Sequence, residues 1–192
     1  MKKTIFVFAV MLNCAIISFA QGAVNGHEYV DLGLPSGVKW ATCNVGANSP
    51  YDFGDYFSWG ETRTKREYST HTHKNINVKN IAGMSRYDVA TAKWGVPWRM
   101  PTKNELDELA RKCSWEWTAN GAVVTGPNGN SIFLPIAGQV YVKSRRYEHR
   151  GMYWSSESYL SSDAHYLNLE SKYSSVLFAP QMFGHSVRPV CK

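Results

Sequence analysis

The segment from Thr102 to Cys113 constrains the fold most, because it is the strongest helix that the sequence predicts. Thr102 is a favourable N-cap residue, and Glu105 follows at the position where its carboxylate can bond back to the Thr102 amide in a capping box. Apolar residues then follow with helical spacing: Leu106, Leu109, Ala110 and Cys113. A helix with one apolar face must pack against another element, and the rest of the chain has the pattern of strands. The sequence therefore predicts an α+β domain in which a sheet covers this helix.

Shorter elements are predicted on both sides of this helix. Residues 87–94 are expected to form one or two helical turns, so that the domain holds two short helices. Asn128-Gly129 is a strong hairpin turn between strands at 123–125 and 131–134. The other predicted strands lie at residues 29–32, 38–42, 114–118, 152–157, 165–170, 175–179 and 185–191.

The start of the main helix carries a motif. The five residues Trp98-Arg99-Met100-Pro101-Thr102, with Glu105, resemble the W-R-x-P-T-x-x-E signature of the Fibrobacter succinogenes major paralogous domain family. Three other stretches fit that family, at residues 29–37, 54–61 and 186–191, so the resemblance covers nearly all of a single domain at 27–192. It implies a C-type-lectin-like fold with two short helices packed on mainly antiparallel strands and hairpins. Formylglycine-generating-enzyme-like domains and the target domains of diversity-generating retroelements are relatives with that fold.

Residues 1–20 have the pattern of a signal peptide. Lys2 and Lys3 precede an apolar stretch that is too short to favour a membrane span, and Ser18-Phe19-Ala20 offers a cleavage site after Ala20. We therefore expect a secreted, periplasmic or cell-surface protein. Lipidation at Cys14 is the alternative, but Asn13 is a poor residue before a lipidated cysteine.

The predicted mature chain is only mildly basic. The whole chain has a formal net charge of +6, and loss of Lys2 and Lys3 with the leader would lower it to +4. The remaining charge is spread along the chain without a run of Lys and Arg. A nucleic-acid partner is therefore not expected.

Three cysteines remain in the predicted mature chain: Cys43, Cys113 and Cys191. An oxidising compartment permits one disulfide among them. The resemblance implies that the C-terminal strand returns to the body of the domain, which favours a Cys113–Cys191 bond between the helix end and that strand. A Cys43–Cys191 bond is one alternative, because the first and last strands should also be neighbours. Three buried thiols without a bond are the other.

Two groups of residues raise the question of a metal. His71 and His73 share one side of an extended segment, but zinc needs three or four ligands and the neighbouring sequence supplies no others. Asp52, Asp55 and Glu61 lie in a Gly-rich loop that matches no EF-hand, and the E-P-N and W-N-D motifs of calcium-dependent lectins are absent from the sequence. We expect no metal site and no cofactor, with a structural ion in that loop as the alternative.

The sequence gives little support for catalysis. Formylglycine-generating enzymes need two redox-active cysteines late in the fold, and only Cys191 stands there. A hydrolase triad would need a nucleophile turn such as G-x-S-x-G, and none places the suitable residues, which are Ser155, Ser156, Asp163 and His165. We expect a protein that is not an enzyme, and keep a degenerate formylglycine-generating-enzyme-like enzyme as an alternative.

Aromatic residues make up 14% of the chain, and those in its late segment, from Gln139 to Phe178, point to a binding surface. Residues 139–151 are predicted to form an exposed loop rich in Tyr and Arg, which are favoured at binding surfaces. Leu167 and Leu169 share one face of their strand, so Tyr166, Asn168 and Glu170, on the other face, should point to solvent beside that loop. The predicted ligand-binding residues are Arg145, Arg146, Tyr147, His149, Tyr166, Asn168 and Glu170. Retroelement-diversified relatives vary their late, aromatic-rich segment, so the resemblance points to the same region.

These observations favour a binding module at the cell surface or outside the cell. Its expected ligand is a glycan or a protein, because Tyr and Arg side chains suit both. A structural, envelope-associated domain without a dedicated ligand is the alternative.

Overall fold

A computed structural model describes residues 21–192, and the predicted leader with Cys14 lies outside the described residues. All strand pairs between named elements are antiparallel, and with two short helices this confirms the α+β class. The helices are α1 (Val89–Trp94) and α2 (Lys103–Lys112). The strands are β1 (Gly22–Val24), β2 (His27–Asp31), β3 (Lys39–Ala41), β4 (Ser114–Thr118), β5 (Gly121–Thr125), β6 (Ser131–Pro135), β7 (Gln139–Tyr141), β8 (Ser144–Arg146), β9 (Arg150–Tyr159), β10 (Asp163–Glu170), β11 (Tyr173–Pro180) and β12 (Val190–Cys191). Within the described part of the chain, no helix has the length and apolar character that crossing a membrane requires.

Helix α2 begins with the predicted capping box. Thr102 accepts a hydrogen bond from the Glu105 amide, and the Glu105 carboxylate accepts one from the Thr102 amide at 2.8 Å. The two terminal guanidinium nitrogens of Arg99 also donate to the Glu105 carboxylate, at 2.6 and 2.8 Å. The pKa of Glu105 is lowered: burial alone would raise it, and the bonds from Arg99 and Thr102 outweigh that effect. The signature residues thus fix the helix start.

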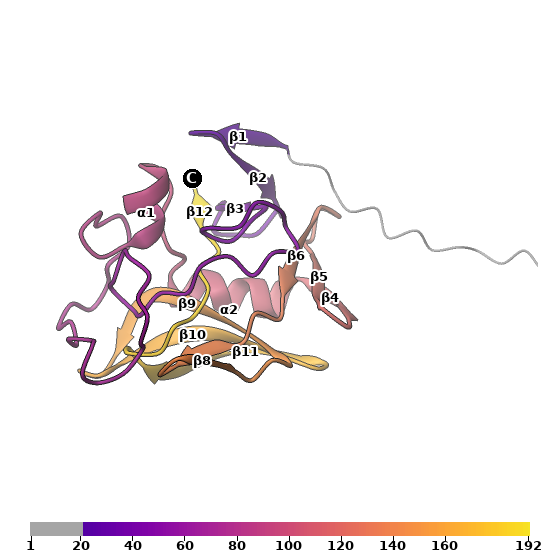
Figure 1. Cartoon of the computed structure of the whole chain (residues 1–192). Coiled ribbons are helices and arrows are strands. Elements are labelled where there is room, and N and C mark those ends of the chain that lie inside the picture. Colours follow the sequence, from indigo (N-terminus) through magenta and orange to yellow (C-terminus); the bar gives the residue numbers. More distant parts are fainter. Residues whose placement is uncertain (1–20) are drawn as a thin grey trace, which may run out of the picture.

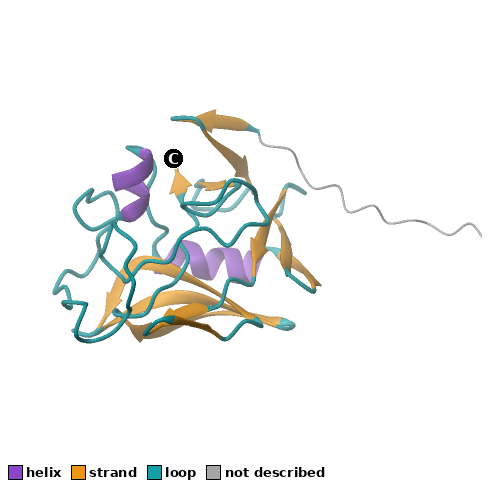
Figure 2. Ribbon diagram, in the orientation of Figure 1, coloured by secondary structure: helices purple, strands orange, loops and turns teal. Residues whose placement is uncertain are grey.

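The apolar side of α2 lies on a three-stranded sheet with the order β11-β10-β9 (Figures 1 and 2). Leu106 and Leu109 are fully buried in one cluster with Leu167 and Leu169 of β10. This confirms the prediction that a sheet covers the helix. Burial of such side chains stabilises the domain by about 1.5–3 kcal/mol each.

A second sheet joins the two ends of the described chain in the order β1-β2-β3-β12. Val190 of β12 lies opposite Trp40 of β3, and the Val190 carbonyl also accepts the Arg99 amide at 3.0 Å. Figure 1 shows the C-terminus beside β3, near α1. The signature segment before α2 is therefore tied directly to the C-terminal strand.

Arg188 is the third residue of the segment 186–191 and is 1% exposed at this junction. Its guanidinium donates to Asn44 Oδ1 at 2.8 Å and to three backbone carbonyls, those of Ala41, Thr42 and Phe133, at 2.8 to 3.0 Å. Burial lowers the pKa of Arg188, although the Tyr153 hydroxyl opposes that change. One buried side chain thus links β6 to the segment after β3.

Strands β4, β5 and β6 form a three-stranded sheet beside α2. The predicted Asn128-Gly129 turn lies between β5 and β6, and Gly129 has a φ of +86° that favours glycine. Trp115 and Trp117 stack with ring centroids 5.6 Å apart on one side of β4, as their alternation predicts.

The cysteines differ from the prediction. Cys43, Cys113 and Cys191 are free thiols, so neither the Cys113–Cys191 bond nor the Cys43–Cys191 bond is present. Cys113 packs against the cluster of α2 and the three-stranded sheet β9–β11, where burial and the charge of Glu108 raise its thiol pKa to about 11. Cys191 lies in a different cluster and pairs with Lys39, at the opposite end of β3 from Cys43. The expected partners are therefore held in separate parts of the core.

Candidate ligand-binding groove

The stretch predicted as an exposed loop at 139–151 is largely a hairpin. Strand β7 pairs with β8, and Val140 exchanges backbone hydrogen bonds with Gly184 at 2.8 and 2.9 Å. Val142 does the same with Tyr68 at 2.9 Å. The hairpin is therefore fixed on both sides by segments far away in the sequence, which a pattern of polar residues does not reveal.

A groove of about 460 Å³ lies between this hairpin and the sheet β9–β11. Both walls contribute large side chains, most of them aromatic, cationic or apolar. The lining residues are Gln139, Tyr141, Arg146, Tyr147, Arg150, Met152, Tyr166, Phe178, Ala179, Pro180, Met182 and Phe183. Five aromatic residues and two arginines thus line one hollow of a size that small ligands fill.

Alternation along β8 separates the two arginines of the predicted site. Arg146 lines the groove and lies over the Tyr141 ring, with 5.9 Å between its guanidinium carbon and the ring centroid. Arg145 lies instead over the Phe53 ring and pairs with Glu148 at 3.4 Å. Adjacent residues of a strand point to opposite faces, so only one of the two can reach the groove.

Two predicted residues of β10 differ from expectation. Tyr166 and Asn168 were expected to face solvent, but they are 7% and 5% exposed, because β10 is the central strand and both of its faces are covered. Tyr166 packs edge-on against Trp154 and still lines the groove. Burial raises the pKa of its hydroxyl, which therefore stays neutral and able to donate a hydrogen bond. Asn168 does not reach the lining.

The other predicted residues lie at or beyond the rim. Tyr147 lines the groove with 54% of its surface exposed and has a φ of 55°, an uncommon conformation for a bulky residue. Glu170 reaches the groove only through Arg150, which it binds at 2.8 Å. His149 is exposed and is not among the lining residues. Of the seven predicted residues, the groove thus brings Arg146, Tyr147 and Tyr166 together.

Sequence analysis did not single out several groove residues. Phe178 is inside the late segment that was predicted to bind, and Tyr141 and Arg150 belong to its polar stretch. Met182 and Phe183 follow β11 in a turn that was given no role. Residue type and spacing do not indicate which side of a strand or turn is covered, so the sequence does not distinguish these residues from others.

Comparison of the chain with protein-family models, with curated proteins and with solved structures finds no match.

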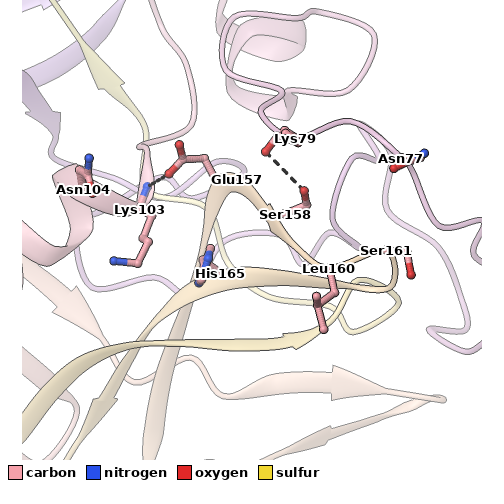
Figure 3. A pocket seen from close by; sticks show the side chains of 9 residues that line it. All are labelled: Asn77, Lys79, Lys103, Asn104, Glu157, Ser158, Leu160, Ser161 and His165. Atoms are coloured by element: carbon pink, nitrogen blue, oxygen red, sulfur yellow. Dashed lines mark hydrogen bonds between the residues drawn. The ribbon is translucent and has the colours of Figure 1, made fainter.

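A second hollow, of about 520 Å³, lies where α2 begins beside the turn between β9 and β10 (Figure 3). Two of its charged side chains already have structural roles. Glu157 accepts the Lys103 amide at 2.7 Å and so helps to cap α2, while the Lys103 ammonium pairs with Asp107. The Ser158 amide donates to the Lys79 carbonyl at 3.0 Å. These contacts stabilise the fold, and the first groove offers more side chains to a ligand.

The residues of a possible hydrolase are not assembled. Ser155 and Ser156 are fully buried, and Ser155 exchanges hydrogen bonds with the Glu157 backbone. His165 packs instead against the Tyr159 ring, with 5.3 Å between the ring centroids. Asp163 accepts a bond from Ser162 at 3.4 Å.

The acidic loop is also engaged internally. Asp52 accepts the Asn48 and Ser49 amides, Asp55 approaches Lys93 at 4.0 Å, and Glu61 binds His73 and Lys65. Within residues 21–192, no group of three or more His, Cys, Asp or Glu side chains is placed to hold a metal ion.

Proposed function

We propose that this protein is an exported, non-enzymatic binding module of the Fibrobacter succinogenes major paralogous type, and that its groove binds glycans carrying carboxylate groups. The observation that carries the proposal is the position of Arg146 among the aromatic rings of the groove. Within the described part of the chain, Arg146 has no carboxylate within 4.0 Å, so its guanidinium is available to a ligand.

The chemistry of the lining suits an acidic sugar. Aromatic rings pack against the apolar face of a sugar ring, and Tyr adds a hydroxyl that hydrogen-bonds sugar hydroxyls. A guanidinium binds a carboxylate through two parallel hydrogen bonds, which gives both affinity and orientation. Arg150, held by Glu170, has its guanidinium carbon 5.4 Å from the Tyr147 ring centroid and adds N–H donors near the rim. Arg146 and Tyr147 are thus the residues expected to contact the sugar first.

The fold and the compartment belong to the same proposal. A C-type-lectin-like arrangement is supported by two short helices, by hairpins and by the pairing of the C-terminal strand β12 with β3. Export is supported by the basic and apolar pattern of residues 1–20. An exported protein meets acidic glycans at envelopes and in the surrounding medium.

A glycan array that contains neutral and uronic-acid oligosaccharides tests the proposal. The wild-type protein should bind acidic members, and Arg146→Gln and Tyr147→Ala should each lose at least about tenfold in affinity. Arg63→Gln and Tyr173→Ala are matched controls, because both residues are exposed and lie outside the groove. Equal binding by all variants, or binding to no acidic glycan, would refute the proposal.

One observation favours a protein ligand as the second candidate. Phe178 is 52% exposed and stacks on Tyr159, which is 37% exposed, with 4.2 Å between the ring centroids. Phe178 lies near the end of β11, an edge strand of its sheet. Exposed aromatic groups on a sheet are typical of protein-binding surfaces. Loss of binding to a protein array in Phe178→Ala, with glycan binding absent, would favour this candidate.

A further inference from the structure

Strand β11 forms one edge of its sheet, and the outer side of this strand is open. It pairs with β10 on one side, and among the described residues no backbone hydrogen bond reaches the other side of residues 173–179. Ala179 is the only buried residue of the strand, whereas Tyr173, Phe178 and Leu177 are 74%, 52% and 43% exposed. The strand thus presents unpaired backbone groups together with large exposed side chains.

The opposite edge of the same sheet is covered. There β9 forms bridges with Gly138, Ser186 and Asn80, which belong to three separate segments. Sheet edges are usually protected by short strands, charges, bulges or prolines. Edge strand β1 has only three residues, and edge strand β4 carries Glu116. In contrast, β11 has eight uncharged residues in continuous register with β10, and its one proline, Pro180, comes last.

The pairing with β10 determines which backbone groups of β11 point outward. A two-residue turn at 171–172 joins the two strands and closes on the pair Glu170–Tyr173. Such a closing pair exchanges both hydrogen bonds, and hydrogen-bonded pairs recur at every second residue of an antiparallel ladder. The N–H and C=O groups of Ser174, Val176 and Phe178 therefore point away from β10.

We propose that the protein forms a symmetric dimer in which β11 of one copy pairs antiparallel with β11 of a second copy, centred on Val176. In this register Ser174 of each copy lies opposite Phe178 of the other, so the outward backbone groups of both copies find partners. A shift by two residues would place Ser174 opposite Pro180, which has no N–H, or Phe178 opposite Lys172 in the turn. The central register therefore satisfies the most backbone groups.

The same register matches the side chains by size. Each large exposed residue of one copy lies opposite a small residue of the other: Tyr173 opposite Ala179, Phe178 opposite Ser174, and Leu177 opposite Ser175. Cross-strand neighbours contact each other, so the large side chains lose exposed apolar surface without crowding. No like charges oppose each other, because residues 173–180 carry no charge. A strand that complements itself in hydrogen bonds, size and charge favours a second copy of this chain over an unrelated partner.

Sedimentation equilibrium of the folded protein tests the proposal. A dimer held by one strand of each copy has a small interface, so we expect a dissociation constant of about 10–100 μM, measured over about 5–500 μM protein. Two charged variants test the register: Ser175→Lys with Leu177→Lys, and Ser175→Glu with Leu177→Glu. Both positions are exposed and lie opposite each other across the dimer, so each variant alone should dimerise at least about tenfold more weakly. An equimolar mixture of the two variants should recover dimers.

Isotope-filtered NMR on a mixture of labelled and unlabelled wild-type protein should show contacts between Ser174 of one copy and Phe178 of the other. The matched control is Ser114→Lys with Thr118→Lys, which adds the same charge to exposed positions of the edge strand β4 and should dimerise like the wild type. Arg146→Gln should also dimerise like the wild type, since Arg146 lies outside β11. Failure of acidic glycans to bind the groove would therefore leave this inference intact.

Three results would each overturn the proposal. The first is a wild type that stays monomeric over the whole concentration range, which would leave the edge to an extended segment of another protein. The second is a pair of charged β11 variants that dimerise as tightly as the wild type, which would place the contact elsewhere. The third is a mixture of those variants that recovers no dimers, because opposite charges then do not meet across the axis.

Discussion

Arg188 and Arg146 have opposite surroundings, although the two residues are of the same type. Arg188 is 1% exposed and donates hydrogen bonds to one side-chain oxygen and three backbone carbonyls. Arg146 is exposed on an aromatic wall and, within residues 21–192, has no carboxylate in reach. The first connects segments of the fold, while the second leaves its donors to solvent or to a ligand.

The same contrast separates two regions of the molecule. Around α2, the polar residues of the signature satisfy one another, as Thr102, Glu105 and Arg99 do. In the groove, the aromatic and cationic side chains face outward from a scaffold whose backbone is already paired. Side chains whose hydrogen-bond partners lie within the protein stabilise the domain. Side chains without such partners are where we expect a ligand to bind.

Substitution of the two arginines should give the largest difference. Arg188→Met removes the donor to four buried oxygens, and we expect a loss of about 4 kcal/mol in the free energy of unfolding. Arg146→Met should change that free energy by less than about 0.5 kcal/mol, as exposed sites generally do. Urea denaturation of both variants measures the contrast, and similar losses would show that the two sites do not differ in the proposed way.

Removal of apolar contacts under α2 should have the next largest effect. Leu106→Ala should cost about 3 kcal/mol, because the side chain is 1% exposed between α2 and the sheet. Leu160→Ala is the matched control, since Leu160 is 73% exposed. If calorimetry finds equal stability for both variants, α2 is not part of the core.

The pH dependence of stability should reflect His185, which packs against Tyr166 and Phe183 of the groove. Its ring is fully buried and stacks on the Trp154 ring, with 3.9 Å between the centroids. Its Nε2 lies 3.1 Å from Gln139 Oε1. Burial lowers its pKa to about 3 in the folded protein, from 6.5. Below pH 6.5, His185 binds a proton in the unfolded chain but stays neutral in the folded one. The free energy of unfolding therefore falls as the pH falls.

Between pH 6.5 and pH 5 this loss should be about 2 kcal/mol. His185→Phe should flatten the dependence in that range, whereas the exposed His71→Gln should not. Urea denaturation at each pH provides the measurement. A wild-type slope equal to that of His185→Phe would exclude His185 as its source.

The helix cap should give the smallest of these effects. Thr102→Ala removes the acceptor for the Glu105 amide and should cost about 1 kcal/mol. Thr64→Ala, on an exposed threonine outside the helices, should be nearly neutral. Indistinguishable melting temperatures for the two variants would mean that the Arg99–Glu105 pair holds the helix start without the cap.

Sequence reasoning succeeded where the deciding contacts are local. The capping box joins Thr102 to Glu105 within one turn, and the Asn128-Gly129 hairpin depends on two residues, so both could be predicted. The sequence did not reveal features that depend on contacts between distant segments. The hairpin at Gln139–Arg146 is held by Tyr68 and Gly184, and Tyr166 is buried because the segments around β10 cover both of its faces.

The candidate site followed the same rule. Composition indicated a Tyr- and Arg-rich late segment, but it could not separate Arg146 from Arg145, because that requires knowing which face of β8 is covered. The burial of His73 could not be predicted, because its partner Glu61 lies twelve positions earlier in an irregular stretch.

The most direct measurement of the central claim is the dissociation constant of the acidic oligosaccharide selected by the array, compared between the wild type and Arg146→Gln. We expect at least about tenfold weaker binding with an unchanged free energy of unfolding, because Arg146 is available to the ligand and does not support the fold. Tyr173→Ala, on a tyrosine that is 74% exposed outside the groove, should bind like the wild type. An Arg146→Gln variant that is fully folded and binds as tightly as the wild type would show that Arg146 does not bind the ligand.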